Sequence, residues 1–232
     1  MRDLDLLDLA RSVVPPSFAG GVRRIADPVV EPLWEGLRVV VAASAGQAVM
    51  VEAGEPVEAH PEVVEAFAAA TDATCDGIVA EAWLTRQVAT GDVGVYTGLG
   101  TEVPGASAYL GRVLLGSRAV RIRETTERLE AGQSAREIGA EDPVNLVAVD
   151  LLWLDGAWLL DVPLQERKRI LESVVPTGEL VRPGIHVRPP VDTWVGSWRA
   201  QGFKGMTYRA ANSRYRPGTA AADWATTPMP RR

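Results

Sequence analysis

Cysteine, histidine and lysine are scarce in this sequence of 232 residues. It contains one cysteine (Cys75), two histidines (His60 and His186) and two lysines (Lys168 and Lys204). A single cysteine excludes an intramolecular disulfide and a zinc site built from a cysteine cluster, and the two histidines are too far apart in sequence to form a helical metal-binding pair. We therefore expect no metal held by soft ligands, and chemistry that needs a lysine amine has two candidate residues.

Long hydrophobic runs are also absent. No segment approaches the roughly 18 consecutive apolar residues that a membrane-spanning helix needs, and residues 1–16 carry acids where a signal peptide would carry basic residues. Hydrophobic residues make up 47% of the chain and charged residues 23%, which is typical of a folded globular protein. The sequence predicts a cytoplasmic protein without membrane contact.

The net charge of -6 is unevenly distributed along the chain. Residues 1–160 contain 12 Arg and 24 Asp or Glu, whereas residues 161–232 contain 12 Lys or Arg and 6 Asp or Glu. The two parts therefore carry -12 and +6. Such blocks can form a basic binding face on an acidic protein, or they can attract one another within a single fold.

Hydrophobic periodicity and turn residues predict an alternation of short strands and helices. Pro61 and Pro163 stand where a proline begins a helix, and residues 144–154 are nearly all apolar, as in a strand buried on both faces. Helices are predicted over residues 1–12, 61–70, 119–131, 163–174 and 191–200, strands over 29–43, 48–51, 77–84, 144–154, 180–187 and 205–209, and loops over 91–105 and 132–143. We therefore expect an α+β fold of packed, mostly antiparallel sheets flanked by helices.

Two segments then carry a family resemblance. VNLVAVDLLWLDGAWLLDVPLQERKRILESV (144–174) and GFKGMTYRAANSRYRPGTAAADW (202–224) are similar to the second half of the adenylation domain of ATP-dependent DNA ligases. The first half aligns more weakly, with VEPLWEGLRVV (30–40) where the family has Glu-x-Lys-x-Asp-Gly-x-Arg and CDGIV (75–79) where it has Asp-Gly-Glu.

The resemblance implies a domain organisation. It implies a nucleotidyltransferase fold of the DNA ligase and mRNA capping enzyme type over residues 27–232, preceded by a helix and linker over residues 1–26. The OB-fold domain that follows in ligases is not expected. Gly36 and Arg38 keep the residues of the family motif.

The resemblance also implies that the reaction centre is degenerate. The family lysine that attacks the α-phosphate of ATP corresponds to Leu33, which has no lone pair to donate. The acids that hold Mg²⁺ correspond to Ile78 and Lys204, and Mg²⁺ requires oxygen ligands. Glu35 replaces an aspartate. Because the lysine and both acids are missing, neither a catalytic residue nor a metal site is expected.

The positions that bind the nucleotide in the family have changed as well. Val149 stands in place of the aromatic residue that stacks on adenine, and Arg209 in place of a lysine, which presents a planar fork instead of a compact ammonium. The resemblance assigns the degenerate nucleotide pocket to Glu31, Glu35, Gly36, Arg38, Asp76, Val149, Lys204 and Arg209. For Arg38 and Arg209 the sequence leaves open whether they face an empty cleft or pair with acids such as Glu31 or Glu35.

Three functional hypotheses follow. The first is a non-catalytic protein of the ligase type that binds or regulates a protein partner in DNA repair or ligation, with no cofactor. The second is a domain that still binds ATP and Mg²⁺ without transferring the nucleotide. The third is an active ATP-dependent ligase or nucleotidyltransferase with an alternative nucleophile, for which Lys204 is a candidate. Basic residues that could bind DNA recur near the C-terminus at Arg199, Lys204, Arg209, Arg214 and Arg216.

Overall fold

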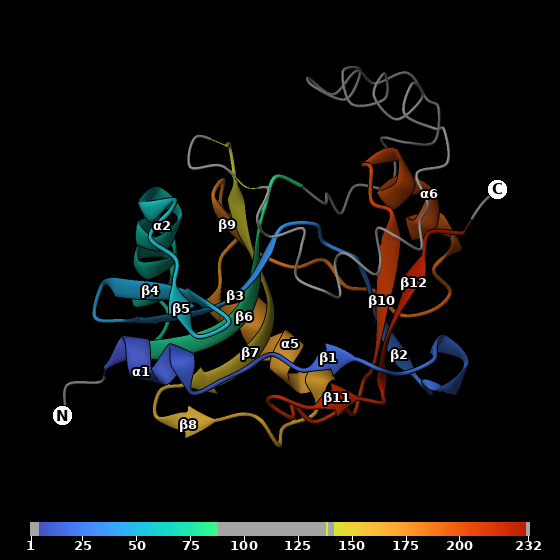
Figure 1. Cartoon of the computed structure of the whole chain (residues 1–232), viewed down its shortest axis with the longest axis horizontal. Helices are drawn as coiled ribbons and strands as arrows, with labels where there is room; N and C mark the ends of the chain where they lie inside the picture. The colour runs from blue at the N-terminus through green and yellow to red at the C-terminus, as the bar shows by residue number, and fades with distance from the viewer. Residues whose placement is uncertain (1–4, 88–137, 139–141, 231–232) are drawn as a thin grey trace.

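The computed structural model describes residues 5–87, 138 and 142–230 (Figure 1). Its largest sheet has seven strands, which are antiparallel except that β9 pairs with β7 in parallel. The strand order is β5 (Glu55–Pro56), β4 (Gln47–Glu52), β3 (Leu37–Ser44), β6 (Gly77–Thr85), β7 (Asn145–Leu154) and β8 (Ala157–Trp158), with β9 (Val181–Pro183) beside β7.

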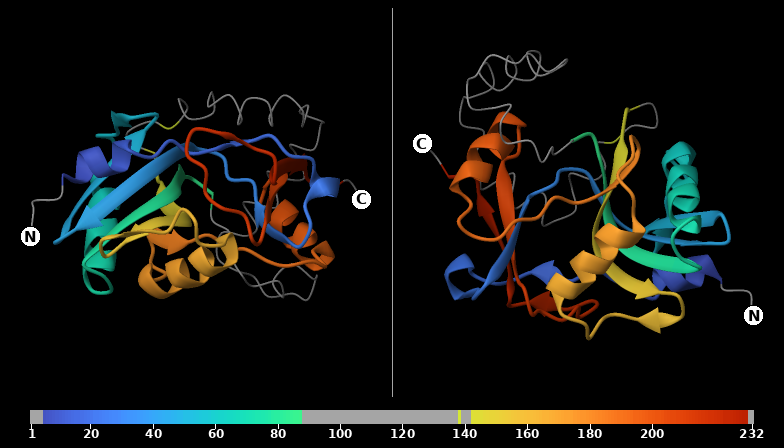
Figure 2. Two further views of the ribbon diagram at one scale, coloured as in Figure 1. Left: turned by 90° about the horizontal axis from the view of Figure 1, so that it is seen from below. Right: turned by 180° about the vertical axis from the view of Figure 1, so that it is seen from behind.

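A second, smaller sheet stands beside the large one (Figures 1 and 2). Its three antiparallel strands follow the order β12 (Trp224–Pro228), β10 (Gly205–Ala210) and β2 (Pro28–Pro32). Two short parallel strands, β1 (Ser17–Phe18) and β11 (Ala220–Ala221), tie the N-terminal segment to the C-terminal one. The predicted α+β class with mostly antiparallel sheets is confirmed.

Four α-helices and one 3-10 helix, η1 (Val22–Arg24), complete the described chain: α1 (Leu6–Arg11), α2 (Pro61–Asp72), α5 (Leu164–Val174) and α6 (Asp192–Ala200). The Asp5 carboxylate accepts hydrogen bonds from the first free backbone N–H groups of α1, as an N-cap residue does. Within the described residues, no helix is long and apolar enough to cross a bilayer.

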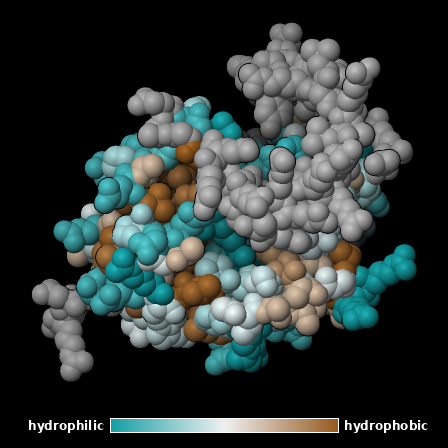
Figure 3. Space-filling view, viewed as in Figure 1, coloured by the Kyte–Doolittle hydropathy of each residue, from teal (hydrophilic) through white to brown (hydrophobic). Residues whose placement is uncertain are grey.

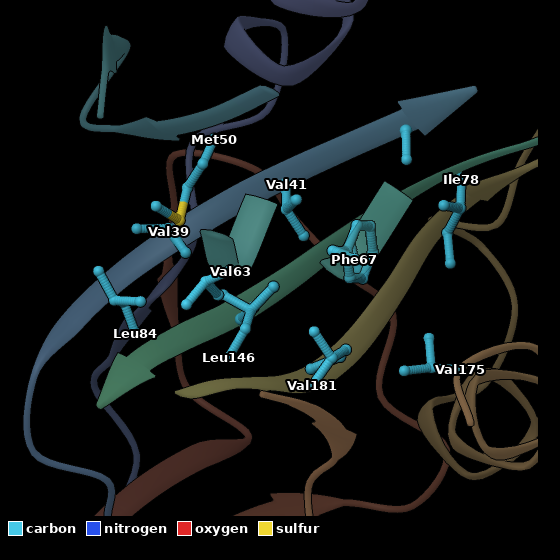
Figure 4. Close-up of a cluster of buried hydrophobic side chains, with 14 of the residues drawn as sticks. Val39, Val41, Met50, Val63, Phe67, Ile78, Leu84, Leu146, Val175 and Val181 are labelled. Atoms are coloured by element: carbon cyan, nitrogen blue, oxygen red, sulfur yellow. The ribbon is translucent and has the colours of Figure 1, made fainter. Parts of the chain in front are cut away.

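The hydrophobic core divides along the two faces of the large sheet. One face carries Ile78, Ala80, Ala82 and Leu84 of β6 and packs against α2 and α5; Figure 4 shows Ile78 and Phe67 of α2 in this cluster. On the other face, α1 and Trp224 of β12 cover one end. The other end is covered by α6 together with β2 and β10 of the small sheet. The candidate site lies on this second face, between the cluster under α1 and the cluster under α6.

The structure refines several predicted elements. The single strand expected over residues 29–43 is two strands in different sheets, because β2 pairs with β10 while β3 pairs with β4 and β6. Gly36 makes this break possible: its φ is +141°, and a Cβ there would lie 2.2 Å from the Leu84 carbonyl oxygen. The strand expected over 180–187 is shorter, although Val187 forms an isolated bridge with Val30.

Other predictions agree with the structure or fall outside it. The helices predicted at 1–12, 61–70, 163–174 and 191–200 and the strands at 77–84, 144–154 and 205–209 are confirmed within one to a few residues at each end where the chain is described. The loop of residues 91–105, the helix of residues 119–131 and most of the loop of residues 132–143 lie outside the described residues.

Candidate functional site

A buried network of charged side chains connects the two sheets and α5. Arg167 donates to Asp150 through two nitrogens, with Nε 2.7 Å from Oδ1 and Nη2 2.9 Å from Oδ2. Arg209 also donates to Asp150, with Nη1 3.1 Å from Oδ2, and its Nε lies 3.1 Å from Oε2 of Glu31. Lys168 pairs with the other oxygen of Glu31. All five residues are at most 2% exposed.

Strand register and helix geometry explain how these charges meet. Thr207 of β10 is the cross-strand partner of Glu31, so Arg209, two residues further on, lies on the same face as Glu31 and diagonal to it. Arg167 and Lys168 lie in the first turns of α5, whose N-terminus is fixed by hydrogen bonds from Leu164 N to Ser213 O and from Gln165 N to Ala211 O. An amphipathic helix is expected to expose such residues. Here they are buried because Asp150 pairs with Arg167 and Glu31 pairs with Lys168.

Neighbouring cations keep the two buried acids ionised. Burial acts to raise the pKa of Glu31, but Arg209 and Lys168 outweigh it and hold the pKa below its ordinary value. For Asp150 burial also acts upward, and Arg167 and Arg209 bring the pKa below the usual range of an aspartate. The network therefore consists of charged groups that satisfy one another.

Leu33, the first residue after β2, is packed into the wall of a cleft. This cleft is also lined by Glu31, Glu81, Val149 and Arg209. Its side chain is 4% exposed, and its backbone N–H donates to Gly205 O over 2.9 Å. The side chain lies against the backbone of Gly205, where an added Cβ would come within 2.9 Å of Leu33 Cδ2. Residue 33 therefore faces the same cleft as Glu31, the place that the resemblance implies for the nucleophile, and presents a hydrocarbon there.

Arg38 has a partner that the sequence did not identify, the cleft residue Glu81. Its Nε lies 2.8 Å from Oε1 of Glu81, and its Nη1 donates to the Pro16 carbonyl oxygen over 2.8 Å. Tyr215 donates its hydroxyl to Oε2 of Glu81 over 2.7 Å, and the Arg38 guanidinium stands 5.3 Å from the ring centre of Phe18. The two arginines that the resemblance assigned to the pocket thus pair with acids: Arg209 with Glu31, and Arg38 with Glu81.

The acid of β6 that reaches the site is Glu81, while residue 78 points elsewhere. Ile78 belongs to the core cluster on the α2 side of the sheet, as Figure 4 shows, so a carboxylate there would not face the cleft in this structure. Glu81 lies three residues further along, on the opposite face, and lines the cleft. A charged residue within the otherwise apolar strand GIVAEAWLT was the signal that could have found it.

Glu35 and Lys204 form an ion pair, and neither residue lines the cleft. Lys204 Nζ lies 2.7 Å from Glu35 Oε1, and the two side chains are 48% and 26% exposed. The backbone N–H of Glu35 donates to Gln87 Oε1 over 2.6 Å, which anchors the turn after β2. The lysine considered as an alternative nucleophile is therefore a partly exposed residue paired with a carboxylate.

Two further predicted positions differ in placement. Val149 is buried in the wall of the cleft. Asp76 does not join the site: it belongs to a turn before β6, where its backbone N–H and that of Gly77 donate to Asp155 Oδ1 over 2.8 and 3.0 Å.

The cleft itself contains little free space. It has a free volume of about 10 Å³, close to the minimum that one water molecule occupies. The residues that line it are Phe18, Glu31, Leu33, Trp34, Glu81, Trp83, Val149, Thr207 and Arg209. Among the described residues, no group of three or more His, Cys, Asp or Glu side chains is arranged to hold a metal ion.

The basic residues near the C-terminus are dispersed by the fold. Arg209 is buried in the charge network and Lys204 pairs with Glu35, while Arg199 donates to the Pro230 carbonyl oxygen. Arg214 is exposed, and Arg216 lies 3.4 Å from Asp161 with a side chain that is 63% exposed. Internal pairing thus accounts for Arg209 and Lys204, whereas Arg214 and Arg216 remain at the surface.

Comparison with known proteins agrees with the family suggested by the motifs. Residues 116–226 match the family described as "ATP dependent DNA ligase domain". Over 86 residues, 37% of this chain, the sequence is 33% identical to the multifunctional non-homologous end joining DNA repair protein LigD of Mycobacterium tuberculosis. Over 111 residues it is 28% identical to a DNA ligase of Methanothrix thermoacetophila.

Solved structures share the fold. The ligase domain of M. tuberculosis LigD matches 94% of this chain with a TM-score of 0.63 and 20% sequence identity. A mycobacterial DNA ligase D described as complexed with ATP and MES matches 93% with a TM-score of 0.55 and 21% identity. The fold is that of the DNA ligase nucleotidyltransferase domains.

This chain corresponds to only part of those proteins. It spans 11% of the length of LigD, 20% of the Methanothrix ligase and 60% of each of the two solved ligase chains. The fold and the match over residues 116–226 thus make this chain similar to an adenylation domain of the ATP-dependent DNA ligase type.

Proposed function

We propose that this chain, an adenylation domain of the ATP-dependent DNA ligase family, is a non-catalytic member that acts as a binding or regulatory protein in DNA repair or ligation. The observation that carries the proposal is Leu33, a buried hydrocarbon packed on Gly205 at the position of the attacking amine. Nucleophilic catalysis needs a lone pair at that place, and no change in the surroundings can supply one to leucine.

The charge network supports the same conclusion for the metal and the nucleotide. Glu31 and Glu81 are the acids that line the cleft, and both are held by cations or by the Tyr215 hydroxyl. A carboxylate engaged in this way is a poor ligand for Mg²⁺, because the ion would have to displace cations that already neutralise its charge. We infer that neither ATP nor Mg²⁺ is a cofactor of this chain.

Retained structure without chemistry is consistent with a role in binding a protein partner. The buried charges hold the two sheets together and stabilise the ligase fold although the amine is missing. Such a domain can dock on another component of a ligation or repair assembly and position it.

A second candidate function is nucleotide binding without transfer. Arg38 is held by Glu81, which lines the cleft, and Trp34 and Trp83 offer aromatic surface in the cleft wall. Binding would require the cleft to open, because its present free volume is about 10 Å³. The retained arginine favours this function, and the filled cleft opposes it.

A direct titration of the chain with ATP distinguishes the two candidates. We expect no saturable heat of binding in calorimetry with millimolar ATP, with or without Mg²⁺. The matched control is Leu33→Ala, which removes hydrocarbon from the cleft wall. Saturable binding by the unaltered chain would establish nucleotide binding, and binding by Leu33→Ala alone would show that packing at residue 33 closes the cleft.

A further inference from the structure

A surface pocket of about 510 Å³ lies between α1, the β3–β4 hairpin and α2. No residue that lines this α1–α2 pocket also lines the cleft. Its walls are largely apolar, with Asp5, Gln47 and Glu65 among the polar residues at its margin. The apolar lining residues are Leu6, Leu7, Ala48, Val49, Val64 and Ala68.

The surface around the α1–α2 pocket is acidic. From Val39 to Thr85 the sequence has no Lys or Arg and eight Asp or Glu. Exposed acids occur on both helices that flank the pocket. The basic residue Arg11 of α1 donates its Nε–H to the Gly54 carbonyl oxygen over 2.9 Å. These exposed acids are Asp5, Asp8, Glu62, Glu65 and Asp72. Figure 3 shows apolar surface surrounded by hydrophilic residues over this side of the molecule.

Charge and apolarity together specify the occupant. An apolar pocket with an acidic margin is complementary to a segment with Leu-like side chains on one face and Lys or Arg along its edges. A nucleic acid would meet repulsion between its phosphates and these carboxylates. A second copy in a two-fold interface would bring the same acids face to face.

We propose that the α1–α2 pocket is a docking site for a basic amphipathic segment of a protein partner. Apolar side chains of the segment enter between α1 and α2, and its cations lie over Glu65 and the acids nearby. The site accounts for the exposed acids along α1 and α2, which take no part in the charge network. It deepens the proposed function and rests on it in one respect: a non-catalytic domain acts through a partner.

The test uses an 18-residue helical Leu/Lys peptide with a fluorescent label and a Leu/Glu peptide of the same pattern. We expect the Leu/Lys peptide to bind the full chain, measured by anisotropy, and the Leu/Glu peptide not to bind. Glu65→Arg and Gln47→Trp should each weaken binding about tenfold or more, the first by charge reversal and the second by obstruction. Glu65 and Gln47 are exposed, so both variants are expected to fold, which a thermal melt checks.

The matched control is Glu179→Arg, an exposed acid outside the pocket, which should change affinity less than twofold. If both pocket variants bound the Leu/Lys peptide as tightly as the unaltered chain, the proposal would be overturned. Binding of the Leu/Glu peptide would also overturn it. Displacement of the peptide by nicked DNA, or self-association abolished by Gln47→Trp, would assign the pocket to another occupant and also overturn it. The ATP titration on the same samples separates the docking proposal from the proposed non-catalytic function. Peptide binding can fail while the chain still shows no binding of ATP, and that result would overturn the docking site alone.

Discussion

Arg209 on the small sheet reaches Asp150 on the large one, with Nη1 of the guanidinium 3.1 Å from Oδ2 of the carboxylate. The same side chain holds Glu31 and donates to the Val149 carbonyl oxygen over 3.0 Å. One buried arginine therefore links three strands, β2, β7 and β10. Arg209 thus holds the small sheet against the large one at the base of the cleft.

Removing the Arg209 cation should strongly destabilise the protein. Arg209→Met leaves Glu31 and Asp150 buried with fewer partners, and breaking a buried pair in this way typically costs about 3 to 5 kcal/mol. We expect that loss in the free energy of unfolding measured by urea denaturation. Arg216→Met, which removes a surface partner of Asp161, should cost about 0.5 kcal/mol or less. Equal effects of the two substitutions would contradict the assigned role of the network.

The pH dependence of stability should follow the lowered pKa values of Glu31 and Asp150. Because folding lowers these values, their contribution is present above the unfolded pKa of about 4 and is lost as pH falls toward the folded pKa. The free energy of unfolding should therefore decrease below about pH 4. Urea denaturation of the wild type and of Asp150→Asn measures this, and the variant should be less stable at neutral pH and less sensitive to acid.

The surface carboxylate Glu166 provides the control for the pH experiment. Its pKa is lowered by the hydrogen bond with Arg169, yet the pair is exposed. Glu166→Gln should leave the acid sensitivity close to that of the wild type. Loss of acid sensitivity in Glu166→Gln with no change in Asp150→Asn would reverse the assignment.

Much of the fold was predictable because apolar periodicity and proline placement are local signals. The strand of residues 144–154 and the helix that follows Pro163 illustrate this. The division of residues 29–43 between two sheets was not predictable, since it depends on which strand each half pairs with. The motif alignment predicted one pocket for positions 31, 33, 38, 149 and 209. In the structure positions 31, 33, 149 and 209 line one cleft, and Arg38 contacts the cleft residue Glu81.

Glu81 and the burial of Lys168 were missed for a different reason. Both depend on partners distant in sequence, namely Arg38 and Tyr215 for Glu81, and Glu31 for Lys168. A sequence read one element at a time assigns a lysine on an amphipathic helix to solvent. Asp76 was assigned to the pocket by alignment, whereas the structure places it in a turn with Asp155.

Binding of nicked DNA by this chain should be weak and sensitive to salt. The overall charge is -6, and the structure engages Arg209 and Lys204 internally, which leaves Arg214 and Arg216 as exposed cations in that segment. Electrophoretic mobility shifts at about 50 and about 200 mM salt measure the affinity. Reversal of Arg214 and Arg216 to Glu should abolish any residual binding without lowering the melting temperature. Tight binding that persists at the higher salt would contradict this prediction.

A single lysine should not restore chemistry. In Leu33→Lys the new amine would stand beside the closed charge network, and nucleophile, metal ligands and phosphate contacts act as a unit. We expect no measurable adenylation of this variant. Its labelling would show that the cleft opens and retains more of its binding groups than the structure indicates.

The most direct test of the central claim is incubation of the unaltered chain with α-labelled ATP and Mg²⁺ or Mn²⁺, followed by denaturing electrophoresis. The account predicts that the protein remains unlabelled, because Leu33 offers no nucleophile and the cations of the cleft are paired with acids. A covalent phosphoramidate on the unaltered chain would contradict it, and its disappearance in Lys204→Ala or Lys168→Ala would identify the alternative nucleophile.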